Sequence, residues 1–219
     1  LRRANSAAFG GLSEITDIAQ AVARLGLKQV ETLVTTMAMK GAFEVCDPNK
    51  QEYLRHLWDH SLIVALGAQR IAETKGFDPE STFLAGLMHD IGRLVVLKGI
   101  DDLQKGNSIE ITQSVLEELM DTLHCELGQR ALEAWNLSEE LQHIARDHEE
   151  ICDDAKDLAM LAVQASDAIA CKLGFHPHAD PELTLLEEPS VELLNLGDIE
   201  LATLMVDLED EFEALRSML

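Results

Sequence analysis

The spacing of apolar residues along the chain predicts α-helices throughout. Apolar positions recur at steps of three and four, and no alternating stretch is long enough for a convincing β-strand. The sequence therefore indicates an all-α fold built as a multi-helix bundle. The predicted helices cover residues 16–26, a second segment ending near 41, then 47–76, 78–89, 109–135, 138–150, 157–174 and a last helix from 198, with an earlier one ending within 5–9.

Two segments are predicted to connect helices. Glycines and charges mark residues 98–107 as a connection, and residues 176–189 hold three of the five prolines, which is typical of a long irregular loop. Gly10 and Gly11 indicate a turn. Caps are expected at Thr16 and Asp198 because short polar side chains accept hydrogen bonds from the first turn of a helix.

The last predicted helix carries one apolar stripe. Its members are Leu201, Leu204, Leu208, Phe212, Leu215 and Leu219. We interpret this helix as packed on the protein's own core, because it is too short to require a partner helix. A dimerising coiled coil is the alternative. From Asp180 onward Arg216 is the only basic residue, so the opposite face is acidic.

Composition and charge narrow the class of protein. The chain has 219 residues, 47% of them hydrophobic, and a formal net charge of −23. Such a charge repels phosphate backbones, so we expect no nucleic-acid partner and reject a helix-turn-helix function for the first two helices. No apolar stretch could cross a membrane and no leader is visible, which predicts a cytoplasmic protein. The four cysteines form no Cys-x-x-Cys pair and are expected to be reduced.

Histidines and aspartates in apolar helical contexts are the candidate functional residues. His89 and Asp90 follow the apolar run of residues 83–88, where their burial is unfavourable unless they bind a partner such as a metal ion. Asp167 lies within a strongly apolar helix. The full set of expected metal ligands is His60, His89, Asp90, His124, His148 and Asp167.

Each of these residues alone has a simpler explanation. A single histidine on a helix is more often an ordinary core or surface residue, and Asp167 could bond a neighbouring backbone group. His56, one turn before His60, receives little weight for the same reason, and His143, His176 and His178 are left outside the site. Together, however, imidazole and carboxylate groups suit zinc, manganese or iron, held as one ion or two. A metal with an open position could activate water for attack on phosphorus.

The order His60, His89-Asp90, Asp167 resembles the signature of the HD superfamily of phosphohydrolases. In that superfamily His124 and His148 match positions that hold a second metal. Residues 4–10, 15–27 and 57–61 are similar to the HDOD family, an HD-related output domain of bacterial signalling proteins. The resemblance implies an HD-domain-like helical fold that begins before this chain does, consistent with the first residue being Leu. It implies one HDOD-like unit over residues 1–219, comprising an N-terminal helical part to residue 45, an HD-like core over 46–175, and a loop with a C-terminal amphipathic helix over 176–219.

Two functions remain open on this evidence. The first is a signalling module that contacts a partner protein or regulatory domain, with or without a retained metal. The second is a metal-dependent phosphohydrolase acting on a phosphoester or nucleotide, in which Asp90 and Arg93 would be the catalytic residues and Arg93 would steady the substrate. The sequence lacks the Gly-Tyr-Pro loop of the related cyclic-dinucleotide phosphodiesterases, has Asp147 where those have the first of two histidines, and has Arg93 where they have lysine. The missing loop and the family resemblance favour the signalling hypothesis. Arginine can still bind phosphate in a bidentate way, so Arg93 alone does not exclude a phosphoester substrate.

Overall fold

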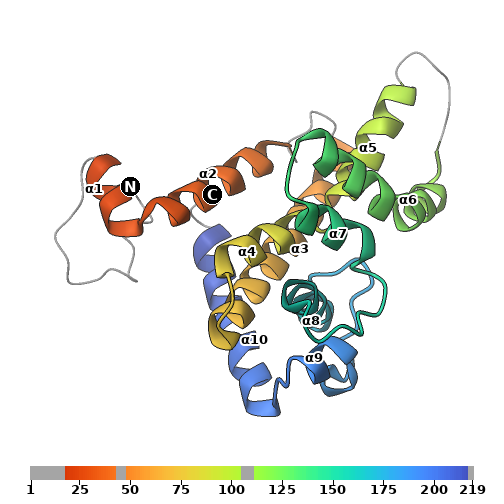
Figure 1. Cartoon of the computed structure of the whole chain (residues 1–219). Coiled ribbons are helices and arrows are strands. Elements are labelled where there is room, and N and C mark those ends of the chain that lie inside the picture. Colours follow the sequence, from red (N-terminus) through yellow and green to blue (C-terminus); the bar gives the residue numbers. More distant parts are fainter. Residues whose placement is uncertain (1–17, 43–47, 105–110, 217–219) are drawn as a thin grey trace.

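Every regular element in the described part of the chain is a helix, as predicted. The computed structural model describes residues 18–42, 48–104 and 111–216. Its elements are α1 (Ile18–Leu25), α2 (Leu27–Ala42), α3 (Pro48–Lys75), α4 (Pro79–Met88), α5 (Ile91–Gln104), α6 (Gln113–Ala134), α7 (Glu139–Asp147), α8 (Leu158–Leu173), the 3₁₀ turn η3 (Leu185–Glu187), α9 (Pro189–Leu193) and α10 (Asp198–Arg216). Figure 1 shows α1 and α2 extending to one side of the body formed by the other helices.

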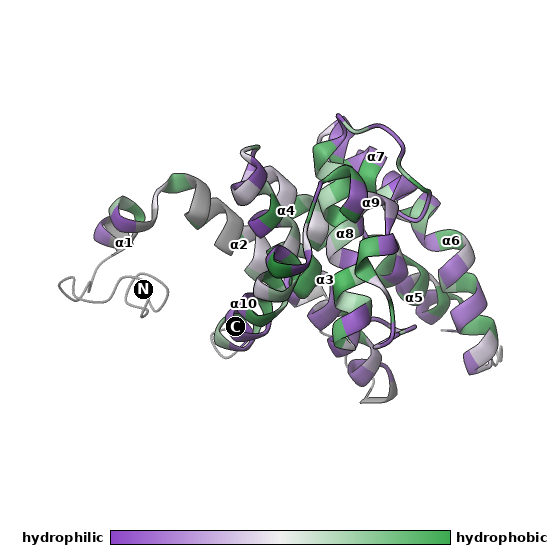
Figure 2. Ribbon diagram, turned by 90° about the horizontal axis from the view of Figure 1, so that it is seen from below, coloured by the Kyte–Doolittle hydropathy of each residue, from purple (hydrophilic) through white to green (hydrophobic). Residues whose placement is uncertain are grey.

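Helix α3 forms the centre of the body. It packs against α4, α8 and α10, and most of its residues from Leu57 to Ala72 are buried. Figure 2 shows green and purple residues alternating along the helices, as expected when each helix turns an apolar face to the interior. The helix ends before Gly76, which has a φ of 81° that other residues rarely adopt. Because α3 contacts three other helices, it fixes the position of His60 relative to them.

Two glycines allow the site-bearing helices to approach closely. At Gly86 an added Cβ would lie 2.7 Å from the Cα of Ala65, so α4 rests directly on the backbone of α3. At Gly92 an added Cβ would lie 1.8 Å from the carbonyl oxygen of His124, so α5 rests on the backbone of α6. These contacts lie on either side of His89 and Asp90, at the junction of α4 and α5.

The C-terminal helix packs on the protein's own core, as the stripe predicts. Leu201, Leu208, Phe212 and Leu215 are buried, and α10 contacts α3. The Phe212 ring meets the Phe175 ring edge-on at 4.8 Å. Leu204 is partly buried against the core, and Leu219 lies outside the described residues.

One predicted connection is wrong over part of its length. Helix α5 continues through residues 98–104, because Leu97 and Ile100 are buried and keep the helix on the core past the exposed Gly99. The rest of that predicted connection, residues 105–107, lies outside the described residues. The predictions made for residues 5–16 and for Asp47 also concern residues outside them. The prediction for 176–189 holds for most of the segment, although η3 interrupts it and α9 begins at Pro189.

Most helix starts match the sequence. Asp78 accepts hydrogen bonds from the N–H groups of Glu80 and Ser81, and Asp157 accepts one from Met160. The final helix begins at Asp198. Among the residues that the structure covers, none of the helices combines the length and apolar character that a bilayer crossing requires.

Candidate metal centre

Five helices or helix ends bring the six predicted ligands together. His60 lies on α3, His124 on α6 and Asp167 on α8. His89 and His148 are the residues at which α4 and α7 end, and Asp90 lies between α4 and α5. All but Asp167 are buried, and Asp90 is only 2% exposed.

Backbone carbonyls fix the orientation of all four imidazole rings. The Nδ1 atoms of His60, His89, His124 and His148 lie 2.7–3.2 Å from the carbonyl oxygens of Phe175, Gly86, Met120 and Ala145. A carbonyl can only accept a hydrogen bond, so each Nδ1 carries a proton and donates it. In a neutral ring of this kind, Nε2 therefore carries a lone pair, and the four Nε2 atoms are directed at the centre. Metal-binding histidines are typically oriented by such a bond from their other nitrogen.

A first group of four atoms surrounds one point in the centre. The Nε2 atom of His60 lies 3.2 Å from Nε2 of His89, 3.6 Å from Oδ2 of Asp90 and 3.3 Å from Oδ1 of Asp167. The Nε2 atom of His89 lies 3.9 Å from each of these carboxylate oxygens. Two atoms bound about 2.1 Å from the same ion lie about 3.0 Å apart at a right angle and about 3.4 Å apart at the tetrahedral angle. The distances from His60 to His89 and to Asp167 fall within this interval, whereas the other three, at 3.6 and 3.9 Å, are a few tenths of an ångström wider.

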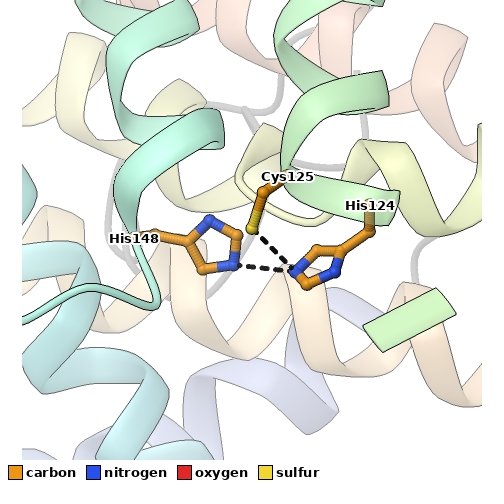
Figure 3. A group of neighbouring side chains, drawn as sticks. All are labelled: His124, Cys125 and His148. Carbon is orange, nitrogen blue, oxygen red and sulfur yellow. Dashed lines mark hydrogen bonds between the residues drawn. The ribbon is translucent and has the colours of Figure 1, made fainter. Parts of the chain in front are cut away.

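A second group of atoms lies on the other side of Asp90. The Nε2 atom of His124 is 3.4 Å from Nε2 of His148, 3.4 Å from Oδ1 of Asp90 and 3.2 Å from Oε1 of Glu149. The Nε2 atom of His148 is 3.5 Å from the same Asp90 oxygen (Figure 3 shows the two rings). Asp90 thus directs one oxygen to each group, as a carboxylate that bridges two ions would.

The centre as a whole contains acceptors that lack a donor. Burial lowers the pKa of His60 to about 4 and that of His89 well below its ordinary value, so both rings are neutral at pH 7. Their Nε2 lone pairs then face each other at 3.2 Å. Oδ1 of Asp90 and Oδ1 of Asp167 are buried and have no hydrogen-bond partner. One divalent cation in each group would satisfy these atoms, and the residues present therefore fit metal ions.

Protonation distinguishes the two groups. Burial lowers the pKa of His124, but its bonds to Cys125 and Glu149 and the charge of Asp90 outweigh that effect and raise the pKa to about 10. The second group can thus hold a proton where a metal would bind. Burial and the charge of Asp90 raise the pKa of Asp167 to about 7. Burial also tends to raise the pKa of Asp90, but His89, His148 and Arg93 outweigh this effect and hold the pKa well below its ordinary value.

Arg93 is anchored by carboxylates. Its Nε donates to Asp90 at 2.9 Å, and its terminal nitrogens lie 3.0 Å from Asp121 and 3.4 Å from Glu149. The side chain is 4% exposed. Arg93 therefore orients Asp90 in this structure, and to bind a substrate phosphate it would have to exchange at least one of these carboxylates.

Three residues outside the predicted set adjoin the centre. Glu149 and Cys125 lie next to predicted histidines, at 3.2 and 3.3 Å from Nε2 of His124. His176, which the sequence analysis left out, has a ring nitrogen within 4.8 Å of ligand atoms of His60 and Asp167. In the sequence, Glu149 and Cys125 could have been found only because each directly follows a predicted histidine. His176 comes from the irregular segment after α8.

The other excluded histidines have partners elsewhere. His143 bonds to Asp147 and Asp157 at 2.8 and 2.9 Å, and His178 lies 3.7 Å from Asp121. His56 is exposed and lies 3.9 Å from Glu52.

A cleft of about 420 Å³ reaches the centre from the surface. Asp167, His148 and His176 are among the residues that line it, together with the acidic residues Glu149, Glu150 and Glu188. No Lys or Arg is among the lining residues in the part of the chain that the structure covers. The cleft therefore presents negative charge to an entering ligand, which favours cations over anions.

Comparisons with known proteins agree with the fold. The "Uncharacterized protein" of Treponema pallidum (strain Nichols) is 25% identical over 156 residues, which are 68% of this chain and 30% of that protein. The chain thus spans less than a third of that relative's length. The crystal structure of an HDOD domain protein of unknown function from Geobacter sulfurreducens has a TM-score of 0.70 and 24% identity, covering 98% of this chain and 78% of the other.

A second solved structure has the same helical arrangement. It is the "Putative metal-dependent phosphohydrolase" of Shewanella amazonensis SB2B, with a TM-score of 0.70 and 20% identity over 95% of this chain and 77% of the other. At these identities the likeness shows a shared fold. The model of the HDOD domain family matches residues 1–151, which is more than half of the chain. The chain therefore belongs to the HDOD domain family.

Proposed function

We propose that this HDOD domain binds one or two divalent transition-metal ions in its His/Asp cluster and acts as an output module of a signalling protein. The observation that carries the metal proposal is the set of unpaired acceptors. Two neutral imidazoles, held by backbone carbonyls, face each other and the unpartnered Oδ1 of Asp167. The unpartnered Oδ1 of Asp90 faces the two histidines of the second group. Burying such acceptors without a cation is strongly unfavourable.

A metal at this position would connect helices that are distant in the sequence. The first group joins α3, the α4–α5 junction and α8 through His60, Asp90 and Asp167. Binding energy at such a site adds to the stability of the arrangement that forms it. Occupancy could then control how the domain contacts a partner protein or a regulatory domain, which is the output that we propose.

The anchoring of Arg93 supports a module over an enzyme. The guanidinium that would steady a substrate phosphate is bound to three carboxylates, and the cleft walls are acidic. Both features disfavour an anionic substrate.

Metal-dependent phosphoester hydrolysis is the second candidate, and the cleft is the observation that favours it. The cleft connects the centre with solvent, so a small phosphoester could reach the ligands. A divalent ion would supply a Lewis acid for a phosphoryl oxygen. Asp90 would hold that ion, and Arg93 would contact the phosphate after leaving Glu149.

Elemental analysis and an activity assay test both candidates. We expect protein purified without chelators to contain at least one equivalent of zinc, manganese or iron. We expect Asp90→Asn to lose that metal and Asp210→Asn, an exposed site on α10, to keep it. Absence of metal from the wild-type protein, even after incubation with each ion, would contradict the proposal. Turnover of a generic phosphodiester with added Mn²⁺, abolished by Asp90→Asn alone, would establish the enzyme instead of the module.

A further inference from the structure

Cys125 lies at the second group of metal-binding atoms, although it is not among the ligands predicted from the sequence. Its Sγ atom is 3.3 Å from Nε2 of His124. Figure 3 shows the thiol of Cys125 extending from α6 toward the two histidine rings. One ligand atom from each of His124, Cys125 and His148 lies within 4.8 Å of the others. The thiol therefore faces the same point as the two imidazoles.

A buried carboxylate oxygen faces this point as well. Oδ1 of Asp90 has no hydrogen-bond partner and lies 3.4 Å from Nε2 of His124 and 3.5 Å from Nε2 of His148. Asp90 is 2% exposed, so water does not solvate that oxygen freely. The two nitrogens and the sulfur, with this oxygen beside the two nitrogens, are then the candidate ligands of the second position.

The sulfur distance suits a shared metal ion. Zinc binds sulfur at about 2.3 Å and imidazole nitrogen at about 2.0–2.1 Å. For angles between 90° and the tetrahedral value, the two ligand atoms then lie about 3.1–3.6 Å apart. The observed 3.3 Å between Sγ and Nε2 of His124 falls within that interval.

We propose that the Cys125 thiolate is a ligand of the second metal position and makes this position prefer Zn²⁺ to Mn²⁺. This inference rests on the proposed metal centre. On binding, the S–H bond breaks, the proton leaves to solvent and a sulfur–metal bond forms in its place. Thiolates favour zinc over manganese, whereas Glu149, the competing ligand at 3.2 Å from His124, would favour a harder ion.

Cobalt substitution tests the proposal with a spectroscopic readout. Co²⁺ titrated into metal-free wild-type protein is expected to give a thiolate-to-cobalt charge-transfer absorption in the near ultraviolet, together with visible ligand-field bands. Cys125→Ser should lose the charge-transfer absorption and keep visible bands from cobalt at the first position. Cys152→Ser is the matched control, since that thiol contacts the backbone oxygen of Asp154, and it should keep both signals.

The outcomes separate this proposal from the broader one. Visible bands without charge-transfer absorption in the wild type would overturn the Cys125 assignment and leave the metal centre standing. Absence of any cobalt signal would overturn both. If Cys125→Ser does not fold, alkylation of the wild-type protein decides, because Zn²⁺ should slow modification of Cys125 and leave Cys152 unaffected. Zn²⁺ affinity at this position should fall roughly 10- to 100-fold in Cys125→Ser, with a smaller change for Mn²⁺.

Discussion

Replacing Gly92 with alanine tests the close approach of α5 and α6 that places Asp90 beside His124. The added Cβ would lie 1.8 Å from the carbonyl oxygen and 2.6 Å from the carbonyl carbon of His124, and 2.7 Å from the backbone nitrogen of Gly128. Cβ atoms essentially never come within 3.0 Å of such atoms, so the helices must separate locally by more than about 1 Å. Backbone atoms cannot rotate away as a flexible side chain would.

The expected cost follows from this overlap. Overpacking a well-packed interface costs about 1–3 kcal/mol, and we expect Gly92→Ala to lie at the upper end because all three contacts are with backbone. Metal binding at the second position should weaken as well, because ligand distances in metal sites lie within about 0.2 Å of their preferred values. Its affinity should fall by at least about tenfold.

Urea unfolding followed by far-ultraviolet circular dichroism, together with a metal competition titration, measures both effects. Gly99→Ala is the matched control on the same helix, because an added Cβ there meets nothing within 4 Å. That variant should be unchanged or up to about 1 kcal/mol more stable, since alanine favours helix over glycine. If Gly92→Ala unfolds at the same urea concentration as Gly99→Ala and binds metal equally well, the packing of α5 on α6 described above is wrong.

Three further predictions concern buried groups. Burial raises the pKa of Tyr53, the only tyrosine, to about 12. Its tyrosinate absorbance should therefore titrate near that value, and the free energy of unfolding should decline as the pH rises from about 10 toward 12. A midpoint near 10 in the folded protein would show that the phenol is exposed. Phe212→Ala, at a residue with 0% exposure, should lower the free energy of unfolding by about 3–5 kcal/mol. Ile199→Ala, at an exposed site on the same helix, should change it by no more than about 0.5 kcal/mol, and equal effects would argue against the packing of α10. In metal-free protein, the raised pKa of Asp167 means that the contribution of this residue to the free energy of unfolding falls as the pH rises from about 4 to 7. The free energy of unfolding of Asp167→Asn relative to that of the wild type should therefore rise across this range in urea titrations, and a constant difference would contradict the assignment.

Helical periodicity and paired ligands predicted much of this structure from the sequence. The stripe on the last helix indicated its packing on the core, and Leu208, Phe212 and Leu215 are buried there. The polar residues at the end of an apolar helix indicated a site, and His89 and Asp90 occupy a junction between two helices at its centre. Both features could be anticipated because burial of apolar surface and the cost of burying unpaired polar groups act locally on recognisable patterns. That the converging side chains bind a metal stays a prediction.

The rest depends on contacts between distant segments. His176 follows α8 by a few irregular residues, and its position beside His60 is set by the path of that segment rather than by any periodic pattern. The continuation of α5 past Gly99 was missed because buried Leu97 and Ile100 stabilise a helix that local glycine content disfavours. Nor could spacing show that Arg93 is bound to Asp121 and Glu149, which come from α6 and from the end of α7.

Anomalous diffraction from crystals grown with Zn²⁺ tests the metal centre most directly, because it locates the ion among the ligands. We expect a peak about 2.0–2.2 Å from Nε2 of His60, Nε2 of His89 and an oxygen of Asp90. A protein that crystallises in this fold with zinc bound only elsewhere, and with those atoms still facing one another without an ion, would contradict it.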